Sequence, residues 1–174
     1  GNSYDDKERC ILAGYENGDI KLFDLRTGTI RYEEHLANGI CGVEFDRKDI
    51  AMNKFAVACL ESQLITFDAR TEEAGSKIKS TYHDMNARTT VWGVRHTPQN
   101  REISAVLLGD GSVGMYKYEY PADRKKEPGI LKRLASKSLA SQPINAWDWH
   151  REKQGLAVCT GFDQVIRVVL ATGY

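Results

Sequence analysis

The sequence has no surplus of charge of either sign and no long apolar segment. Lys and Arg together number 24, as do Asp and Glu, so the formal net charge is zero. This balance gives no electrostatic reason to expect nucleic acid or an anionic membrane as the main partner. No apolar run approaches the roughly 20 residues of a membrane-spanning helix, and the first residues do not read as a secretory leader. We therefore expect a soluble protein of the cytoplasm or nucleus.

Patterns typical of metal sites and catalysis are also missing. Cys10, Cys41, Cys59 and Cys159 form no Cys-x-x-Cys pair and have no His at zinc-ligand spacing, so we expect small buried side chains in a reducing compartment. The glycines of GDGSVG (109–114) are spaced somewhat as in a phosphate loop. No helix is expected after them, so a hairpin turn is favoured. The sequence thus predicts no cofactor, no metal and no enzyme activity.

The sequence does contain a hairpin that recurs four times, first in AGYENGDIKLFDLRTG (13–28). A strand of small apolar residues precedes a short polar turn, and a second strand with a bulky residue follows. The first strands are CILAGY (10–15), FAVACL (55–60), SAVLLG (104–109) and LAVCTG (156–161). The second strands are DIKLFD (19–24), QLITFD (63–68), SVGMYK (112–117) and VIRVVL (165–170). The aligned bulky positions are Phe23, Phe67, Tyr116 and Val169, spaced by 44, 49 and 53 residues.

Two further strand types flank the hairpins. An inner strand precedes three of them, in ICGVEFD (40–46), VWGVRHT (91–97) and INAWDWH (144–150). A weaker outer strand follows three of them, in TIRYEEHL (29–36), SKIKSTYH (76–83) and RLASKSLA (133–140). The sequence therefore predicts fourteen strands, and the absence of a sustained 3.6-residue apolar period predicts little helix.

Four strands in a period of about 40–50 residues indicate blades of a WD40-type β-propeller, in an all-β fold. A single four-stranded sheet cannot cover either of its faces, so blades stack and bury both faces of each sheet. Small residues such as Ala13, Gly14, Ala58 and Cys59 would let neighbouring blades approach closely.

We expect residues 1–174 to form a partial propeller of about three and a half blades. We expect residues 1–37 to form a partial blade that lacks its inner strand. Residues 38–84 and 90–140 should each form one blade. Residues 143–174 should form a partial blade that lacks its outer strand. The two ends would leave sheet faces and edges open. The sequence therefore predicts half of a larger ring, covered by its other half or by a second copy.

WD repeats often carry a hydrogen-bonded set of Asp, His, Ser or Thr, and Trp, which is incomplete here. The Asp position between the middle strands is occupied by Asn17, Glu61, Asp110 and Asp163, and no Trp stands at the bulky position. His83 fits the loop His of one blade and His35 is a weaker candidate, although either could be a solvated loop residue. The blades must then depend mainly on apolar packing.

Several segments are more specific than generic WD sequence, above all FDRKDIAMNK (45–54) and RHTPQNRE (95–102). With AGYENGDIKLFDLR, KYEYP, SQPINAWDW and GFDQVIRV, they resemble the C-terminal half of the WD-repeat family of axonemal dynein assembly factors over essentially the whole chain. The resemblance implies a seven-bladed propeller without catalytic activity. It also implies a co-chaperone adaptor in cytoplasmic dynein assembly. Its implied partners are an assembly of RuvB-like ATPases with a prefoldin-like module, and axonemal dynein heavy chains.

Exposed aromatic and Arg side chains at a propeller rim are the best candidates for binding a partner protein. The candidate protein-binding residues are Tyr15, Asn38, Arg88, Trp92, Asn145 and Phe162. Trp92 could instead pack between blades, and at least one of Trp147 and Trp149 should face a core. The basic segment ADRKKEPGILKR (122–133) could dock an acidic partner or be a solvated loop. The alternative function is a WD40 reader of a modified peptide, such as a histone tail or a degradation signal.

Overall fold

The computed structural model describes residues 9–46, 51–71, 77–85 and 89–173 and arranges them in four antiparallel sheets. Sheet 1 holds β1 (Cys10–Gly14), β2 (Asp19–Asp24) and β3 (Thr29–His35). Sheet 2 holds β4 (Ile40–Phe45), β5 (Phe55–Cys59), β6 (Gln63–Asp68) and β7 (Lys79–Asp84). Sheet 3 holds β8 (Val91–His96), β9 (Ile103–Leu108), β10 (Ser112–Glu119) and β11 (Ile130–Ser138). Sheet 4 holds β12 (Ile144–Trp149), β13 (Leu156–Gly161) and β14 (Ile166–Leu170).

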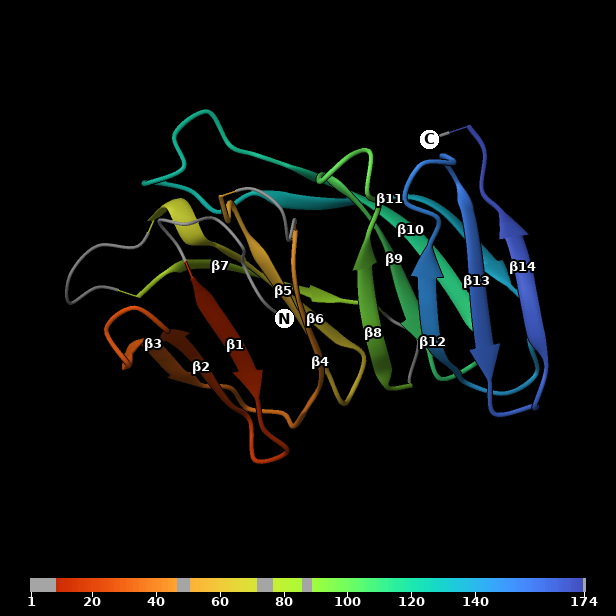
Figure 1. Cartoon of the computed structure of the whole chain (residues 1–174), viewed down its shortest axis with the longest axis horizontal. Coiled ribbons are helices and arrows are strands. Elements are labelled where there is room, and N and C mark those ends of the chain that lie inside the picture. Colours follow the sequence, from red (N-terminus) through yellow and green to blue (C-terminus); the bar gives the residue numbers. More distant parts are fainter. Residues whose placement is uncertain (1–8, 47–50, 72–76, 86–88, 174) are drawn as a thin grey trace.

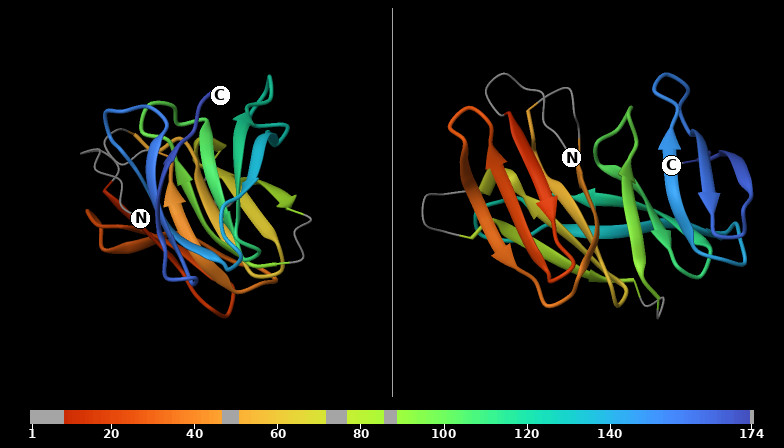
Figure 2. Two further views of the ribbon diagram at one scale, coloured as in Figure 1. Left: turned by 90° about the vertical axis from the view of Figure 1, so that its right-hand side faces the viewer. Right: turned by 60° about the horizontal axis from the view of Figure 1, so that its bottom comes forward.

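Within every sheet the strands lie in the order of the chain, so each sheet is a meander closed by short turns. The sheets follow one another across the molecule from the red to the blue end of the chain (Figures 1 and 2). Strand β4 lies against β1 and β8, and β8 lies against β12, so the first strands of successive sheets are neighbours. This is the arrangement of propeller blades around an axis.

All fourteen predicted strands are present, and the all-β propeller prediction is confirmed. The inner strands and hairpins end within two residues of their predicted limits. Two outer strands differ more, because β7 begins at Lys79 and β11 begins at Ile130. Among the described residues the only helical element is the 3₁₀ turn η1 (Ala69–Thr71), as the lack of helical periodicity predicted.

Strand β5 shows how stacking buries both faces of a sheet. Phe55, Val57 and Cys59 point into the core shared with sheet 1, whereas Ala56 and Ala58 point into the core shared with sheet 3. A third core lies between sheets 3 and 4 and includes both Trp147 and Trp149, which pack edge to face. Burial of this continuous apolar surface is the main stabilising term, at about 25 cal/mol per Å².

Small residues bring neighbouring sheets together, as predicted. A Cβ added to Gly14 would lie 2.4 Å from Cγ2 of Ile40, so only glycine permits this approach of β1 to β4. The four cysteines are free thiols. Cys10, Cys59 and Cys159 are buried in the cores, as predicted, whereas Cys41 is only half-buried. Burial raises the pKa of the Cys59 thiol to about 12, so it stays protonated and unreactive.

Candidate functional site

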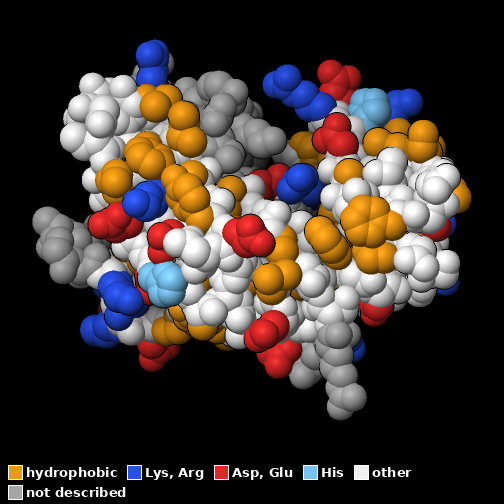
Figure 3. Space-filling view, turned by 90° about the horizontal axis from the view of Figure 1, so that it is seen from below, with side chains coloured by type: hydrophobic (Ala, Val, Ile, Leu, Met, Phe, Trp, Pro, Cys, Tyr) orange, Lys and Arg blue, Asp and Glu red, His pale blue; other side chains and the backbone are white. Residues whose placement is uncertain are grey.

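The turns that join the two strands of each repeated hairpin open on one face of the molecule, which we call the lower rim. It consists of the β1–β2, β5–β6, β9–β10 and β13–β14 turns and of the described residues of the links that lead into β4, β8 and β12. It is the lower side of Figure 1 and is seen face on in Figure 3, where hydrophobic and acidic side chains intermingle. The predicted binding residues that the structure describes all belong to these turns and links or to the strand ends beside them.

The turns are fixed locally by polar side chains. The Oδ1 atoms of Asn17, Asp110 and Asp163 each accept a hydrogen bond from the backbone N–H two residues later, at 3.1, 2.8 and 3.3 Å. This is an Asx turn, which holds a tight reversal without distant partners. Glu61 occupies the fourth equivalent position and instead has a φ of 58°. The repeat position therefore shapes each turn through a local contact.

The turns are also tied to the outer strands. The residue after the polar position has a positive φ in all four turns. The carbonyl of Gly18 accepts a backbone hydrogen bond from the N–H of Leu36 at 2.9 Å. In the same way, the carbonyl of Ser62 accepts from Met85 at 2.8 Å, and that of Gly111 accepts from Leu139 at 3.0 Å. These repeated bonds make the lower rim a preformed surface, so less conformational entropy is lost when a partner binds.

Tyr15, Asn38 and Asn145 lie on this rim with different exposure. Tyr15 is exposed, and its carbonyl accepts hydrogen bonds from the N–H groups of Gly18 and Ile40. Asn38 is half-buried in the link before β4. Asn145 is exposed at the start of β12, where its Oδ1 accepts a bond from Thr160 at 3.4 Å. Arg88, the remaining candidate, lies outside the described residues.

Trp92 and Phe162 come from different sheets but form one aromatic pair. Trp92 is the second residue of β8, and Phe162 lies in the β13–β14 turn. Their ring centroids are 5.5 Å apart with an interplanar angle of 85°, which is an edge-to-face contact. Phe162 is 51% exposed and Trp92 is half-buried. The pair thus offers a rigid aromatic surface that spans two blades.

His83 and His35, the two candidates for the loop His of the WD polar set, have surroundings that differ from those expected for that residue. His83 is not a loop residue, because it pairs with Leu64 inside the β6–β7 ladder. Its Nε2 is buried and has no hydrogen-bond partner among the described residues, and burial lowers the pKa of His83 to about 4. His35 lies at the end of β3, with Nδ1 2.7 Å from Oδ1 of Asp19. This contact, with one from Asn17, holds the pKa of Asp19 below its usual range.

A polar cluster on the opposite, upper rim was not predicted. Lys54 is only 1% exposed, and its Nζ donates to the carbonyl of Arg101 at 2.5 Å and to the hydroxyl of Tyr120 at 3.2 Å. It also lies 3.6 Å from Asp46, which Arg101 contacts through Nε at 2.6 Å. Burial lowers the pKa of Lys54, although the charges of Asp46 and Glu102 oppose this shift.

This cluster joins the segments that carried the most specific sequence resemblance. Asp46 and Lys54 come from the first of these segments, Arg101 and Glu102 from the second, and Tyr120 from the segment KYEYP. Arg124 extends the cluster into the basic segment 122–133, which we call the basic loop. Its guanidinium pairs with Asp68 of sheet 2 and stacks on the ring of Tyr120 at 4.4 Å. The basic loop is therefore anchored at Arg124.

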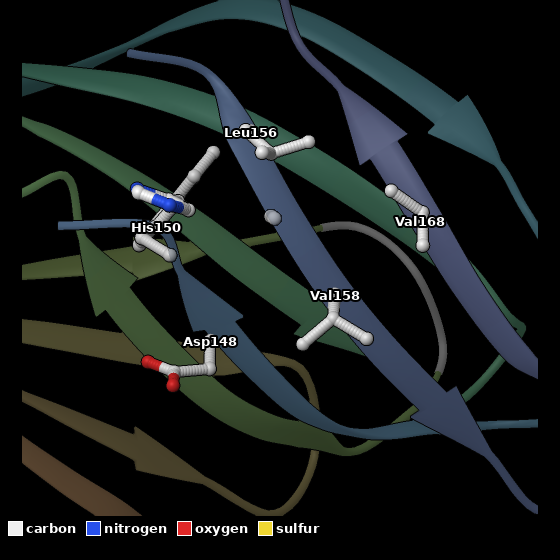
Figure 4. Close-up of a pocket in the computed structure, with 7 residues that line it drawn as sticks. Asp148, His150, Leu156, Val158 and Val168 are labelled. Atoms are coloured by element: carbon white, nitrogen blue, oxygen red, sulfur yellow. The ribbon is translucent and has the colours of Figure 1, made fainter. Parts of the chain in front are cut away.

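The outer face of sheet 4 is apolar and uncovered. Ile166, Val168 and Leu170 of β14 are 72%, 76% and 66% exposed, although all three are large aliphatic residues. Val158 and Val168 are paired neighbours on this face, and Figure 4 shows them beside Asp148 and Leu156 around a shallow hollow of about 290 Å³. The hollow has no cluster of polar groups that converge on a ligand.

The described residues contain no group of three or more His, Cys, Asp or Glu side chains placed to hold a metal ion. In the same part of the chain, no helix has the length and apolar character needed to cross a lipid bilayer. What the rim offers is a broad surface of turns with an aromatic pair, which suits protein binding.

The fold and the rim define the class: the chain is part of a WD40-type β-propeller. The β-propeller domain of Cps50 (Swd1) from Myceliophteria thermophila matches 95% of the chain and 50% of its own length. The TM-score is 0.69 at 15% identity, so this likeness concerns the fold alone. No family model matches the sequence.

Curated relatives resemble the chain far more closely in sequence than this propeller does. The chain is 48% identical to Dynein axonemal assembly factor 10 of Chlamydomonas reinhardtii, over 99% of the chain and 51% of that protein. It is 44% identical to the proteins of that name from Danio rerio and Homo sapiens, over 99% of the chain and 50% of each. The chain is thus homologous along its whole length to Dynein axonemal assembly factor 10, also called Monad, and spans about half of it. This confirms the resemblance found in the sequence.

Proposed function

We propose that the chain forms half of a propeller ring that acts as a non-catalytic scaffold in the assembly of axonemal dyneins. The observation that carries the proposal is the 43–48% identity, over 99% of the chain, to six proteins named as dynein axonemal assembly factors. The preformed lower rim supports it, because a rigid surface with an aromatic anchor suits the holding of other proteins.

In finer detail, the protein is a co-chaperone adaptor in the cytoplasm. Its partners are the assembly of RuvB-like ATPases with a prefoldin-like module, and axonemal dynein heavy chains. The lower rim, with Tyr15, Asn38, Trp92, Asn145 and Phe162 as candidate contacts, is where we propose that one of them binds; Arg88, outside the described residues, stays a candidate from the sequence alone. Trp92 and Phe162 form the anchor, and the more polar residues form its edge.

The remainder of the ring covers the open face of sheet 4. The curated relatives and the Cps50 propeller are about twice as long as this chain, so each has length for further blades. In the complete protein, amide hydrogens of β14 should then exchange slowly. Exchange of β14 as fast as that of an exposed turn would contradict this closure.

The experiment is a pull-down with the complete natural protein carrying Trp92→Ala and Phe162→Ala. Loss of at least one partner is expected, whereas Tyr82→Ala, which removes an exposed aromatic side chain of β7, should keep all partners. If the double variant retains every partner, the rim assignment is wrong. If the double variant keeps its protein partners but no longer binds a modified peptide that the natural protein binds on a peptide array, the alternative function of a peptide reader is favoured.

A further inference from the structure

The charge of the chain is unevenly distributed although its sum is zero. Residues 117–138 contain seven basic and three acidic residues. This segment runs from the end of β10 through the basic loop into β11. The excess of positive charge is thus concentrated on the outer part of sheet 3.

Strand β11 is the outermost strand of sheet 3, in the order β11-β10-β9-β8. It is nine residues long, and all of them except Leu131 are exposed. No described strand pairs with its outer edge, so a row of backbone N–H and C=O groups is open there. Such an edge can accept an extended chain as an added strand.

Basic residues of β10 and β11 face one another without neutralisation by a described acidic residue. Lys132 lies directly opposite Lys117 of β10, and the register places Lys137 on the same face of the sheet. Like charges directly opposite in a sheet repel. All three side chains are exposed, and none of them forms an ion pair with any residue in the described ranges.

The equivalent outer strand of sheet 1 shows the contrast. In β3, Glu33 lies opposite Lys21, 3.7 Å from its Nζ. Glu34 pairs with Lys77 at 2.7 Å, and His35 contacts Asp19. The charges of β3 are therefore satisfied within the fold, whereas those of β11 remain available to a partner.

The start of β11 is held in place by neighbouring elements. The carbonyl of Gly129 accepts a hydrogen bond from Oγ1 of Thr81 at 2.7 Å, and its N–H donates to the hydroxyl of Tyr118 at 3.2 Å. Arg124 anchors the preceding loop to Asp68 of sheet 2. The backbone at the start of the open edge is thus held in place before a partner binds, which lowers the entropic cost of binding.

We propose that the open edge of β11 binds an acidic, extended segment of a partner protein as an added strand. Backbone hydrogen bonds to the edge would align the segment, and its carboxylates would neutralise Lys117, Lys132 and Lys137. An acidic polypeptide fits better than a nucleic acid, because a nucleic acid cannot continue the backbone ladder of the sheet. This site uses the strand edge of β11 and not the Trp92–Phe162 pair, and it is independent of the function proposed above.

The test measures fluorescence anisotropy of a labelled peptide of alternating Glu and Val with the complete natural protein. Binding is expected to weaken roughly tenfold or more in the variant Lys132→Glu with Lys137→Glu, and to weaken as salt is raised. The matched control is Arg151→Glu with Lys153→Glu, which makes the same change of charge on exposed residues of the β12–β13 link. The control should bind the peptide as the natural protein does. Equal melting temperatures would show that both variants fold.

A second pair of ligands separates strand addition from simple charge attraction. The same peptide with alternate backbone nitrogens methylated cannot complete the ladder and should lose most of its affinity. A single-stranded oligonucleotide of equal charge should bind more weakly than the unmodified peptide. The proposal is overturned if the methylated peptide binds equally well, if the oligonucleotide binds more tightly, or if no binding depends on Lys132 and Lys137.

Discussion

The indole of Trp92 in β8 meets the ring of Phe162 edge to face, 5.5 Å from centroid to centroid, and so joins sheets 3 and 4 at the lower rim. Each residue was a separate candidate in the sequence, in repeats about 70 positions apart. In the structure they form a single aromatic surface. A partner that engages Phe162 therefore also contacts a blade boundary.

A double-mutant cycle on this pair should reveal a coupling. We expect the losses in the free energy of unfolding for Trp92→Ala and Phe162→Ala to be non-additive by about 0.5–1.5 kcal/mol, as for other aromatic pairs. The measurement is denaturant unfolding of the two single variants and the double variant. Strict additivity would show that the rings do not interact in solution.

The β9–β10 turn should tolerate only glycine at position 111. Gly111 has a φ of +84°, and an added Cβ would lie 2.1 Å from the carbonyl oxygen of Ala140. We expect Gly111→Ala to lower the free energy of unfolding by at least about 2 kcal/mol. Gly28→Ala is the control, because Gly28 also has a positive φ but nothing lies within 4 Å of its added Cβ. Gly28→Ala should lower the free energy of unfolding by about 1 kcal/mol. Equal losses of stability in both variants would show that contact with Ala140 is not what excludes a side chain at position 111.

His83 should make the fold sensitive to acid. Its imidazole stays neutral in the folded protein down to a pKa of about 4, whereas the unfolded chain binds the proton near pH 6.5. The unfolded state therefore takes up more protons between these values, and stability falls as the pH is lowered through this window. We expect a loss of about 1–2 kcal/mol between pH 7 and pH 5.

The replacement His83→Gln should flatten this part of the pH dependence of the free energy of unfolding. Thermal unfolding at several pH values would measure it in both proteins. A variant whose stability declines as steeply as that of the natural protein would rule out His83 as the source.

Lys54 should be essential to the upper-rim cluster. Lys54→Met removes the ammonium group beside the buried Asp46 and leaves Glu102 without its Nζ donor, so we expect a loss of about 3 kcal/mol in the free energy of unfolding. Lys77→Met, which breaks the exposed pair with Glu34, should cost at most about 0.5 kcal/mol. Chemical denaturation compares the two, and a Lys54 variant as stable as the Lys77 variant would contradict the assignment.

The strands and their order could be predicted from the sequence because the hairpins repeat small and bulky residues at nearly constant spacing. Outer strands were placed less well. The residues of β11 are exposed on both faces, so no apolar alternation marked its start at Ile130. His83 was assigned to a loop for the same reason, since β7 carries little apolar pattern.

The upper-rim cluster could not be predicted, because it depends on contacts between segments about 50 to 70 residues apart. A lone Lys54 in the sequence reads as an exposed side chain, and only the packing of Tyr118 and Tyr120 over it produces its burial. The contact of Trp92 with Phe162 could not be predicted from the sequence either. Spacing placed both residues on one rim, but no repeat rule specifies which side chains meet across a blade boundary.

Site-specific photo-crosslinking in cells that build motile cilia would show whether partner proteins are held on the lower rim. A photoreactive amino acid would replace Asn145 on the lower rim or, as the control, Glu152 on the β12–β13 link of the upper rim, both of which are exposed. We predict that position 145 captures a dynein heavy chain or a co-chaperone subunit and that position 152 does not. Capture of these partners from position 152 alone would contradict a scaffold that works through its lower rim.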